Sequence, residues 1–172
     1  MPDSRKQHFI DELKSHYGEI IAGARGAEVD MAEAADTLQG QARNREDAKS
    51  AVEFSRMAGA HKQRRERAKR EVDALVRFTA AGLPTLRPTA RVCLGALVDV
   101  CVEDEKGSEE RTFFVLPVGA GNQLTGPGGD GFVSVVTPES PVGRGLVGTV
   151  AGDSFELSTA GVDREWTIVD VC

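Results

Sequence analysis

The feature that most constrains this chain is a regular spacing of apolar and small residues over roughly its first forty positions. The steps alternate between four and three residues, through Phe9, Leu13, Tyr17, Ile20, Ala24, Ala27, Met31, Ala34 and Leu38. This is the period of a helix that packs along one narrow stripe. Such a stripe is too thin to form the centre of a globule, so it predicts a long helix, over about 4–38, that requires a partner helix.

The partner helix is predicted in the residues that follow. A turn is expected at 39–44, where glycine and asparagine accept turn geometry. A second helix is expected over about 46–78, and its weaker stripe reads Ala48, Val52, Ser55, Ala58, Val72, Leu75 and Phe78. A break of the first helix at 23–26 stays open as an alternative, because a helical glycine costs up to about 1 kcal/mol relative to alanine.

Beyond the helices the pattern changes from helical to strand periodicity. Residues 82–90 form the expected linker, because one glycine and two prolines stop a helix there. Strands are expected at 98–102, 112–118, 132–136, around Phe155 and Leu157, and from Trp166 to Val171. Ser140 and Pro141 predict the start of a short helix over 141–147. The expected fold class is α+β: an antiparallel helical hairpin over 1–81, followed over 91–172 by a small antiparallel β-sheet domain with one short helix.

Charge is distributed unevenly between these two parts. Residues 1–90 carry 16 Lys and Arg against 14 Asp and Glu, whereas residues 91–172 carry 5 against 13, a net charge of −8. An acidic domain is not typical of a general DNA-backbone binder, and it favours a protein partner of basic character. No apolar run reaches the ~18 residues of a membrane span. The three cysteines have no CxxC spacing, which favours buried free thiols and a cytoplasmic location.

Several stretches match motifs of enzyme sites but lack the surrounding residues that such a site needs. A GxGxxG pattern at 143–148 follows two prolines and has only 24 residues after it, too few for a dinucleotide-binding fold. The glycine-rich loop at 119–129 lacks the Lys-Ser/Thr pair of a phosphate loop. His8, His16 and His61 have no carboxylate or thiol cluster beside them, and we expect them to be solvated. The chain is therefore predicted to have no complete active site and not to be an enzyme.

Two charged clusters remain as candidate sites. The basic run over 62–70 comprises Lys62, Arg64, Arg65, Arg67, Lys69 and Arg70. It is either a solvated helix face, which the neighbouring acids favour, or a contact for an RNA or DNA phosphate backbone. The acids near the expected turn are Glu28, Asp30, Glu33, Asp36, Glu46, Asp47 and Glu53. Carboxylates there could share a divalent cation such as Mg²⁺ that is held elsewhere.

The C-terminal motifs resemble those of the bacterial Gre-factor family of transcription elongation factors (GreA/GreB). The matching stretches are Val133-Ser134-Val135, then the segment over 140–148, then Gly152-Asp153, and the closing strand over 164–169; Leu94-Gly95-Ala96-Leu97-Val98 is similar to the family's opening strand. The resemblance implies an FKBP-like sheet domain that docks on RNA polymerase beside the secondary channel. It also implies a coiled coil that enters the channel toward the active-site Mg²⁺.

The resemblance also implies which residues act. Contact with the polymerase is expected from Ser140, Pro141, Val142, Arg144 and Leu146. At the hairpin tip, Asp47 matches the first of the family's two acids, with Glu46 and Asp36 as further candidates. Asp47 would share Mg²⁺ with the polymerase, and no cofactor would be bound permanently. The charge of the basic run, and not the resemblance, predicts that Arg64, Arg65, Arg67 and Arg70 contact nascent RNA or DNA, and only within the polymerase complex.

The tip departs from the family pattern at one position. Ser50 stands where the second acid is expected, and one carboxylate holds a cation less well than two. Entry into the channel is therefore better supported than stimulation of transcript cleavage. The expected function is modulation of backtracked, paused or initiating polymerase, with cleavage left open. The alternatives are a non-cleaving regulator or adaptor similar to nucleoside-diphosphate-kinase regulators, and a peptidyl-prolyl isomerase built on the aromatic residues Phe113, Phe114, Phe132, Phe155 and Trp166.

Overall fold

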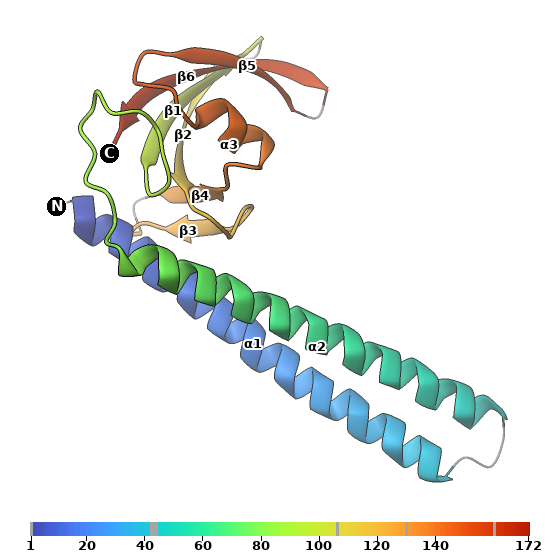
Figure 1. Cartoon of the computed structure of the whole chain (residues 1–172). Coiled ribbons are helices and arrows are strands. Elements are labelled where there is room, and N and C mark those ends of the chain that lie inside the picture. Colours follow the sequence, from blue (N-terminus) through green and yellow to red (C-terminus); the bar gives the residue numbers. More distant parts are fainter. Residues whose placement is uncertain (1, 42–44, 106, 130, 160) are drawn as a thin grey trace. The chain divides into compact units, whose positions relative to one another are not determined.

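The computed structural model describes residues 2–41, 45–105, 107–129, 131–159 and 161–172 (Figure 1). Two long helices come first, α1 (Pro2–Gln41) and α2 (Arg45–Ala80). The later elements are β1 (Leu97–Asp104), β2 (Gly107–Val115), β3 (Gln123–Thr125), β4 (Phe132–Val136), α3 (Pro141–Leu146), β5 (Ser154–Thr159) and β6 (Val162–Val171). The predicted fold class, a helical hairpin followed by a β domain with one short helix, is confirmed.

Both long helices extend slightly further than predicted. α1 is continuous through Gly23 and Gly26, so the alternative of a break there is wrong. Of the predicted turn at 39–44, residues 39–41 still belong to α1, and residues 42–44 lie outside the described residues. None of the described helices has an apolar stretch long enough to cross a membrane.

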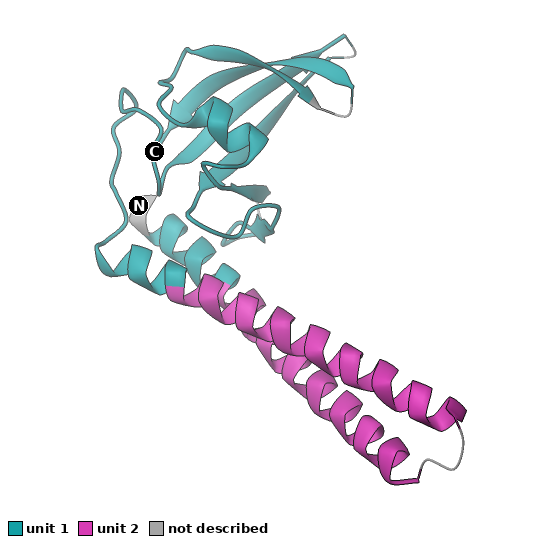
Figure 2. Cartoon of the chain, turned by 45° about the vertical axis from the view of Figure 1, so that its right-hand side comes forward, with its two compact units in different colours: residues 1–13, 74–172 teal, residues 14–73 magenta. Residues whose placement is uncertain are grey.

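The described residues form two compact units, which Figure 2 distinguishes by colour. The hairpin unit comprises residues 14–73, and the sheet unit comprises residues 1–13 with 74–172. The first turns of α1 and the last turns of α2 therefore pack with the sheet. The domain division predicted at 81 and 91 remains a prediction.

The stripe predicted on α1 is the face that this helix buries. Phe9 and Leu13 are fully buried, and Tyr17 and Ala24 are nearly so. Toward the end of α1 the most buried residue is Ala35, one position beyond the predicted Ala34, which is half-buried. The Tyr17 hydroxyl donates a hydrogen bond to the Glu71 carboxylate of α2, which ties the two arms of the hairpin unit together.

The stripe predicted on α2 is wrong over its first half. Ala48, Val52 and Ser55 are exposed, whereas Ala51 is buried. Buried or half-buried residues recur with steps of four and three at Ala51, Phe54, Ala58, His61, Arg65, Ala68, Val72 and Leu75. This spacing is that of a heptad seam, but His61 and Arg65 place ionisable side chains at two of its positions. A search for apolar residues alone therefore selects the wrong register.

A pair of opposite charges occupies the middle of the hairpin seam. The Arg65 Nε lies 2.9 Å from the Glu28 Oε2, and the two side chains are 19% and 23% exposed. Arg65 also lies 3.5 Å from Glu66, which in turn pairs with Lys69. A polar contact inside a coiled-coil seam disfavours shifted registers, because a shift would leave each charge without its partner.

The sheet unit contains one six-stranded sheet in the order β3-β4-β2-β1-β6-β5. The predicted sheet was antiparallel throughout, but β2 and β4 are parallel, with Thr112 opposite Val133 and Val115 opposite Val136. The chain leaves β2, forms the unpredicted strand β3, and then returns as β4 between them. β2 also begins at Gly107, five residues before the predicted start at 112, and ends at Val115 instead of 118.

One face of the sheet and α3 enclose the main core. Trp166 lies between the rings of Phe155 and Phe113, with ring centroids 5.9 and 5.6 Å away. Leu146 of α3 is fully buried in the same cluster, and Val142 packs against it. Three of the aromatic residues that would line an isomerase pocket thus pack against one another inside the core.

The start of α1 packs within the sheet unit. Phe9 contacts Phe114, with ring centroids 6.2 Å apart, and the buried Lys6 donates a hydrogen bond to the Pro84 carbonyl at 2.7 Å. His8 Nε2 lies 3.1 Å from the Thr125 carbonyl oxygen of β3. The expectation that His8 is simply solvated is therefore wrong, because this end of the helix covers the sheet.

Candidate functional site

The segment that carries the family resemblance forms α3 and its two caps. The Ser140 hydroxyl accepts a hydrogen bond from the Gly143 amide at 3.1 Å and donates one to the Thr137 carbonyl at 2.7 Å. Pro141 lies in the first turn of α3, where a backbone N–H would have no acceptor within the helix, so its missing N–H removes no hydrogen bond. At the other end the Val147 amide donates to the Gly143 carbonyl. The sequence Ser-Pro therefore starts this helix for the predicted reason.

The glycines of α3 are explained by packing. A Cβ atom at Gly143 would lie 1.9 Å from the Thr137 carbonyl oxygen, and one at Gly145 would lie 2.3 Å from the Phe155 ring. Real Cβ atoms do not approach other atoms so closely. The first two glycines of the GxGxxG pattern thus let a short helix lie directly against its neighbours.

The five residues predicted to contact a partner divide into two groups. Leu146 is fully buried, Val142 packs on the core, and Ser140 caps the helix. Pro141 and Arg144 are exposed, and Arg144 Nε donates a hydrogen bond to the Glu139 carbonyl at 2.9 Å. Val147, which the sequence analysis did not single out, is 41% exposed directly after α3.

The predicted tip acids lie on both arms of the hairpin unit. Glu46 and Asp47 belong to the first turn of α2, and Asp36 is exposed near the end of α1. Carboxylates in a first turn are favoured by the positive end of the helix dipole. Ser50 lies one turn further along α2 and is half-buried. Because it is a serine, the position of the family's second acid carries no charge.

The described residues contain no group of three or more His, Cys, Asp or Glu side chains that could hold a metal ion. The thiols are free, but the expectation that they are buried is wrong, because Cys93 is exposed and Cys101 and Cys172 are half-buried. Burial and the Glu103 carboxylate raise the pKa of the Cys101 thiol, which disfavours the thiolate that binds metals.

The basic run on α2 is partly paired within the hairpin unit. Arg65 points into the seam toward Glu28, and Arg67 lies 3.1 Å from Glu71. Arg64 and Arg70 are exposed. Lys62, Arg67 and Arg70 also border a shallow hollow of about 600 Å³ along α2. Of the four arginines predicted to contact nucleic acid, Arg64, Arg67 and Arg70 are therefore exposed and Arg65 is not.

No protein-family model and no curated protein matches this chain. Among solved structures, it is similar to GreA factor homolog 1 (Gfh1) of Thermus thermophilus, with 19% identity, coverage of 92% of this chain and 94% of that chain, and a TM-score of 0.37. Gfh1 of Thermus aquaticus is 20% identical, covers 90% and 92%, and has a TM-score of 0.36. The transcription elongation factor GreA/GreB of Nitrosomonas europaea is 23% identical, covers 50% and 62%, and has a TM-score of 0.35. At these scores the likeness does not bear on function.

Proposed function

We propose that this protein is a Gre-type accessory factor of RNA polymerase that acts through the secondary channel and modulates backtracked, paused or initiating complexes. The observation that carries the proposal is a two-helix hairpin with acids in the first turn of α2, in the same chain as the Ser140–Pro141 helix of the Gre-like motif. The arms of the hairpin unit, about 28 residues each, would be about 40 Å long at ~1.5 Å per residue. That length suits a probe that enters a channel.

The surface proposed to bind the polymerase consists of Pro141, Arg144 and Val147. An exposed apolar residue beside an exposed arginine is a combination enriched at protein interfaces. The backbone beneath it is held firmly, because the Arg91 guanidinium donates to the Gly148 carbonyl at 2.7 Å and the Gly148 amide donates to the Val92 carbonyl at 2.9 Å. The surface would therefore lose little conformational entropy on binding.

A second candidate is a polymerase regulator that enters the channel without stimulating cleavage. The uncharged Ser50 favours it, because the acid that would complete a pair of metal ligands is absent from that position. In both candidates the protein contributes positioned carboxylates and the polymerase supplies the catalytic metal. They differ in whether the transcript is cut, and a cleavage assay on stalled complexes separates them.

Reversing the charge of Arg144 is expected to weaken binding to core RNA polymerase. We expect Arg144→Glu to raise the dissociation constant about tenfold, because an arginine at the centre of an interface commonly contributes this much or more. Biolayer interferometry with immobilised polymerase and the full chain measures the effect.

The matched control is Arg87→Glu, which makes the same charge change at an exposed linker position of the sheet unit. It is expected to bind like the unmodified protein. Equal binding by the Arg144 and Arg87 variants would show that α3 is not part of the interface. Absence of binding by the unmodified chain would refute the proposed function itself.

A further inference from the structure

The outer half of the hairpin unit, residues 25–41 and 45–64, buries very little apolar surface. Among these described residues the buried apolar side chains are those of Ala35 and Ala51. The larger side chain of Phe54 is only half-buried. A two-helix hairpin gains most of its stability from the apolar surface that its helices bury against each other. The two arms are therefore held together weakly in this half.

Glycines weaken the same two helices further. Five of them lie within α1 and α2, namely Gly18, Gly23, Gly26, Gly40 and Gly59. Apart from the adjacent residues and the nearby backbone of its own helix, a Cβ atom added at any of them would meet no described atom within 4 Å. Close packing, which explains the glycines of α3, is therefore not the reason for these five. Each one shifts a helix toward its open form by about fivefold relative to alanine.

An ion pair marks the inner boundary of this weak half. The Arg65 Nε of α2 lies 2.9 Å from the Glu28 Oε2 of α1. On the inner side of the pair Ala68 is buried, and the Tyr17 hydroxyl donates a hydrogen bond to the Glu71 carboxylate. An opening that starts at the outer ends of the arms would thus proceed at low cost only as far as the Arg65–Glu28 pair.

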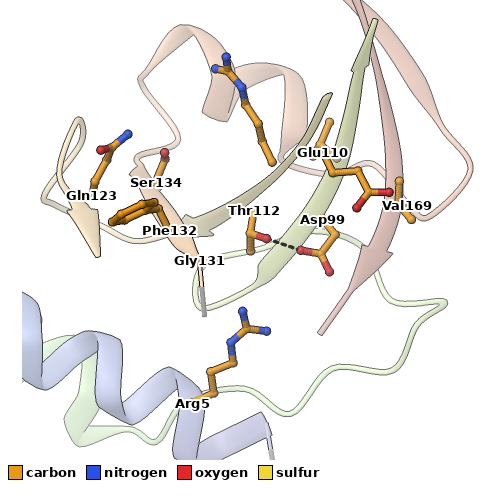
Figure 3. A pocket seen from close by; sticks show the side chains of 11 residues that line it. Arg5, Asp99, Glu110, Thr112, Gln123, Gly131, Phe132, Ser134 and Val169 are labelled. Atoms are coloured by element: carbon orange, nitrogen blue, oxygen red, sulfur yellow. Dashed lines mark hydrogen bonds between the residues drawn. The ribbon is translucent and has the colours of Figure 1, made fainter. Parts of the chain in front are cut away.

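The sheet unit is held together more firmly, even where its surface is hollowed. A concavity of about 680 Å³ adjoins β2, and the charged residues that border it are Arg5, Asp99, Glu110 and Arg111 (Figure 3). Cations and anions balance there, and the Thr112 hydroxyl of β2 donates a hydrogen bond to the Asp99 carboxylate of β1 at 2.6 Å. β1 is also paired with β2 along its whole length. The amides of β1 are therefore a suitable reference for a firmly folded part of the chain.

We infer that the outer half of the hairpin unit opens and closes as a separate cooperative unit while the sheet unit stays folded. Segments with few buried apolar contacts open with free energies well below that of global unfolding. Separated arms would also lose their helical structure, because isolated helices are marginal in water. Opening separates Arg65 from Glu28 and thereby releases the one arginine that the closed hairpin keeps in its seam. The inference is independent of the proposed function.

Hydrogen exchange of the full chain, followed by mass spectrometry, measures this opening. We expect the amides of residues 30–39 and 50–62 to exchange at least about a hundredfold faster than those of Leu97–Val102 in β1. Gly59→Ala should slow exchange about fivefold in both arms of the outer half, although residue 59 lies only on α2. The matched control Gly18→Ala makes the same change inside the boundary, and it should leave exchange of the outer half unchanged.

A second variant tests the boundary itself. Glu28→Gln removes one charge of the pair and should speed exchange of the outer half about fivefold, whereas Glu33→Gln, the same change at an exposed position of α1, should not. Outer-half amides as protected as those of β1 would overturn the inference. So would slowing by Gly59→Ala that is confined to α2, because the arms would then open independently. Equal slowing of the outer half by Gly18→Ala and Gly59→Ala would contradict it too, because the hairpin would then open as a whole.

Discussion

Replacing Gly143 by alanine is expected to destabilise the sheet unit by about 2–4 kcal/mol, even though alanine is the better helix former. The added Cβ would lie 1.9 Å from the Thr137 carbonyl oxygen and 2.9 Å from the Ser140 hydroxyl oxygen. Both neighbours are fixed, because the same carbonyl and hydroxyl form the cap of α3. The backbone must therefore move, and the cap must be lost or distorted. Urea unfolding followed by the fluorescence of Trp166, the chain's one tryptophan, measures the loss.

Two matched glycine substitutions place limits on this explanation. Gly145→Ala should cost less, because the clashing Phe155 ring is half-exposed and can turn away. Gly23→Ala lies in the middle of α1 with nothing within 4 Å of the new Cβ, and it should stabilise the hairpin unit by about 0.5–1 kcal/mol in far-UV circular dichroism. An unfolding midpoint of Gly143→Ala equal to that of the unmodified protein would show that α3 does not pack as described.

Truncating Phe9 to alanine is expected to remove about 3–5 kcal/mol of stability from the sheet unit, which is typical of a fully buried phenylalanine. Phe9 is fully buried against Phe114, and the Arg5 guanidinium lies 5.6 Å from the centre of its ring. The same Trp166 fluorescence measures this effect, although Phe9 lies far from Trp166 in the sequence. The experiment therefore asks whether the start of α1 and the sheet unfold together.

The control for this substitution is Phe132→Ala, which removes a mostly exposed ring from the same unit and should change stability by no more than about 0.5 kcal/mol. If residues 1–13 instead belonged to a separate hairpin domain ending at 81, Phe9→Ala would leave the Trp166 transition unchanged. That outcome would support the domain boundary predicted from the sequence and contradict the division into units described above.

The hairpin could be predicted from sequence because its first arm carries an almost uninterrupted apolar stripe. The register of the second arm could not, because His61 and Arg65 occupy seam positions and Val52 does not. Arg65 is acceptable there only because Glu28 meets it from the other helix. Counting apolar residues along one helix cannot identify a seam position where a charged residue is paired with a residue of the partner helix.

The sheet was predictable as a set of strands, but its pairing was not. β3 has only three residues, too few for its alternating pattern to identify a strand, and its insertion places β4 parallel to β2. The coverage of the sheet by the start of α1 was also missed, because Lys6, His8 and Glu12 appear as an ordinary polar helix end until Pro84 and Thr125 are brought to them. Such contacts depend on residues more than seventy positions apart, which local periodicity does not register.

At the candidate site, sequence analysis located α3 and its cap but did not separate its buried residues from its exposed ones. Leu146 and Val142 belong to the motif because they fill the core, whereas Arg144 and Pro141 remain available to a partner. A short helix of six residues shows too little of a periodic pattern to assign its faces. The packing of Gly143 and Gly145 settles which side of α3 faces inward.

The central claim is that carboxylates at the start of α2 act inside RNA polymerase, and transcription by stalled complexes tests it most directly. The full chain is added to backtracked polymerase with Mg²⁺, and both resumed elongation and transcript cleavage are followed on gels. We predict that the unmodified protein changes one of these rates, that Asp47→Asn reduces the change at least about tenfold, and that Asp73→Asn, an equal charge change elsewhere on α2, does not. An effect that Asp47→Asn leaves intact would contradict the account.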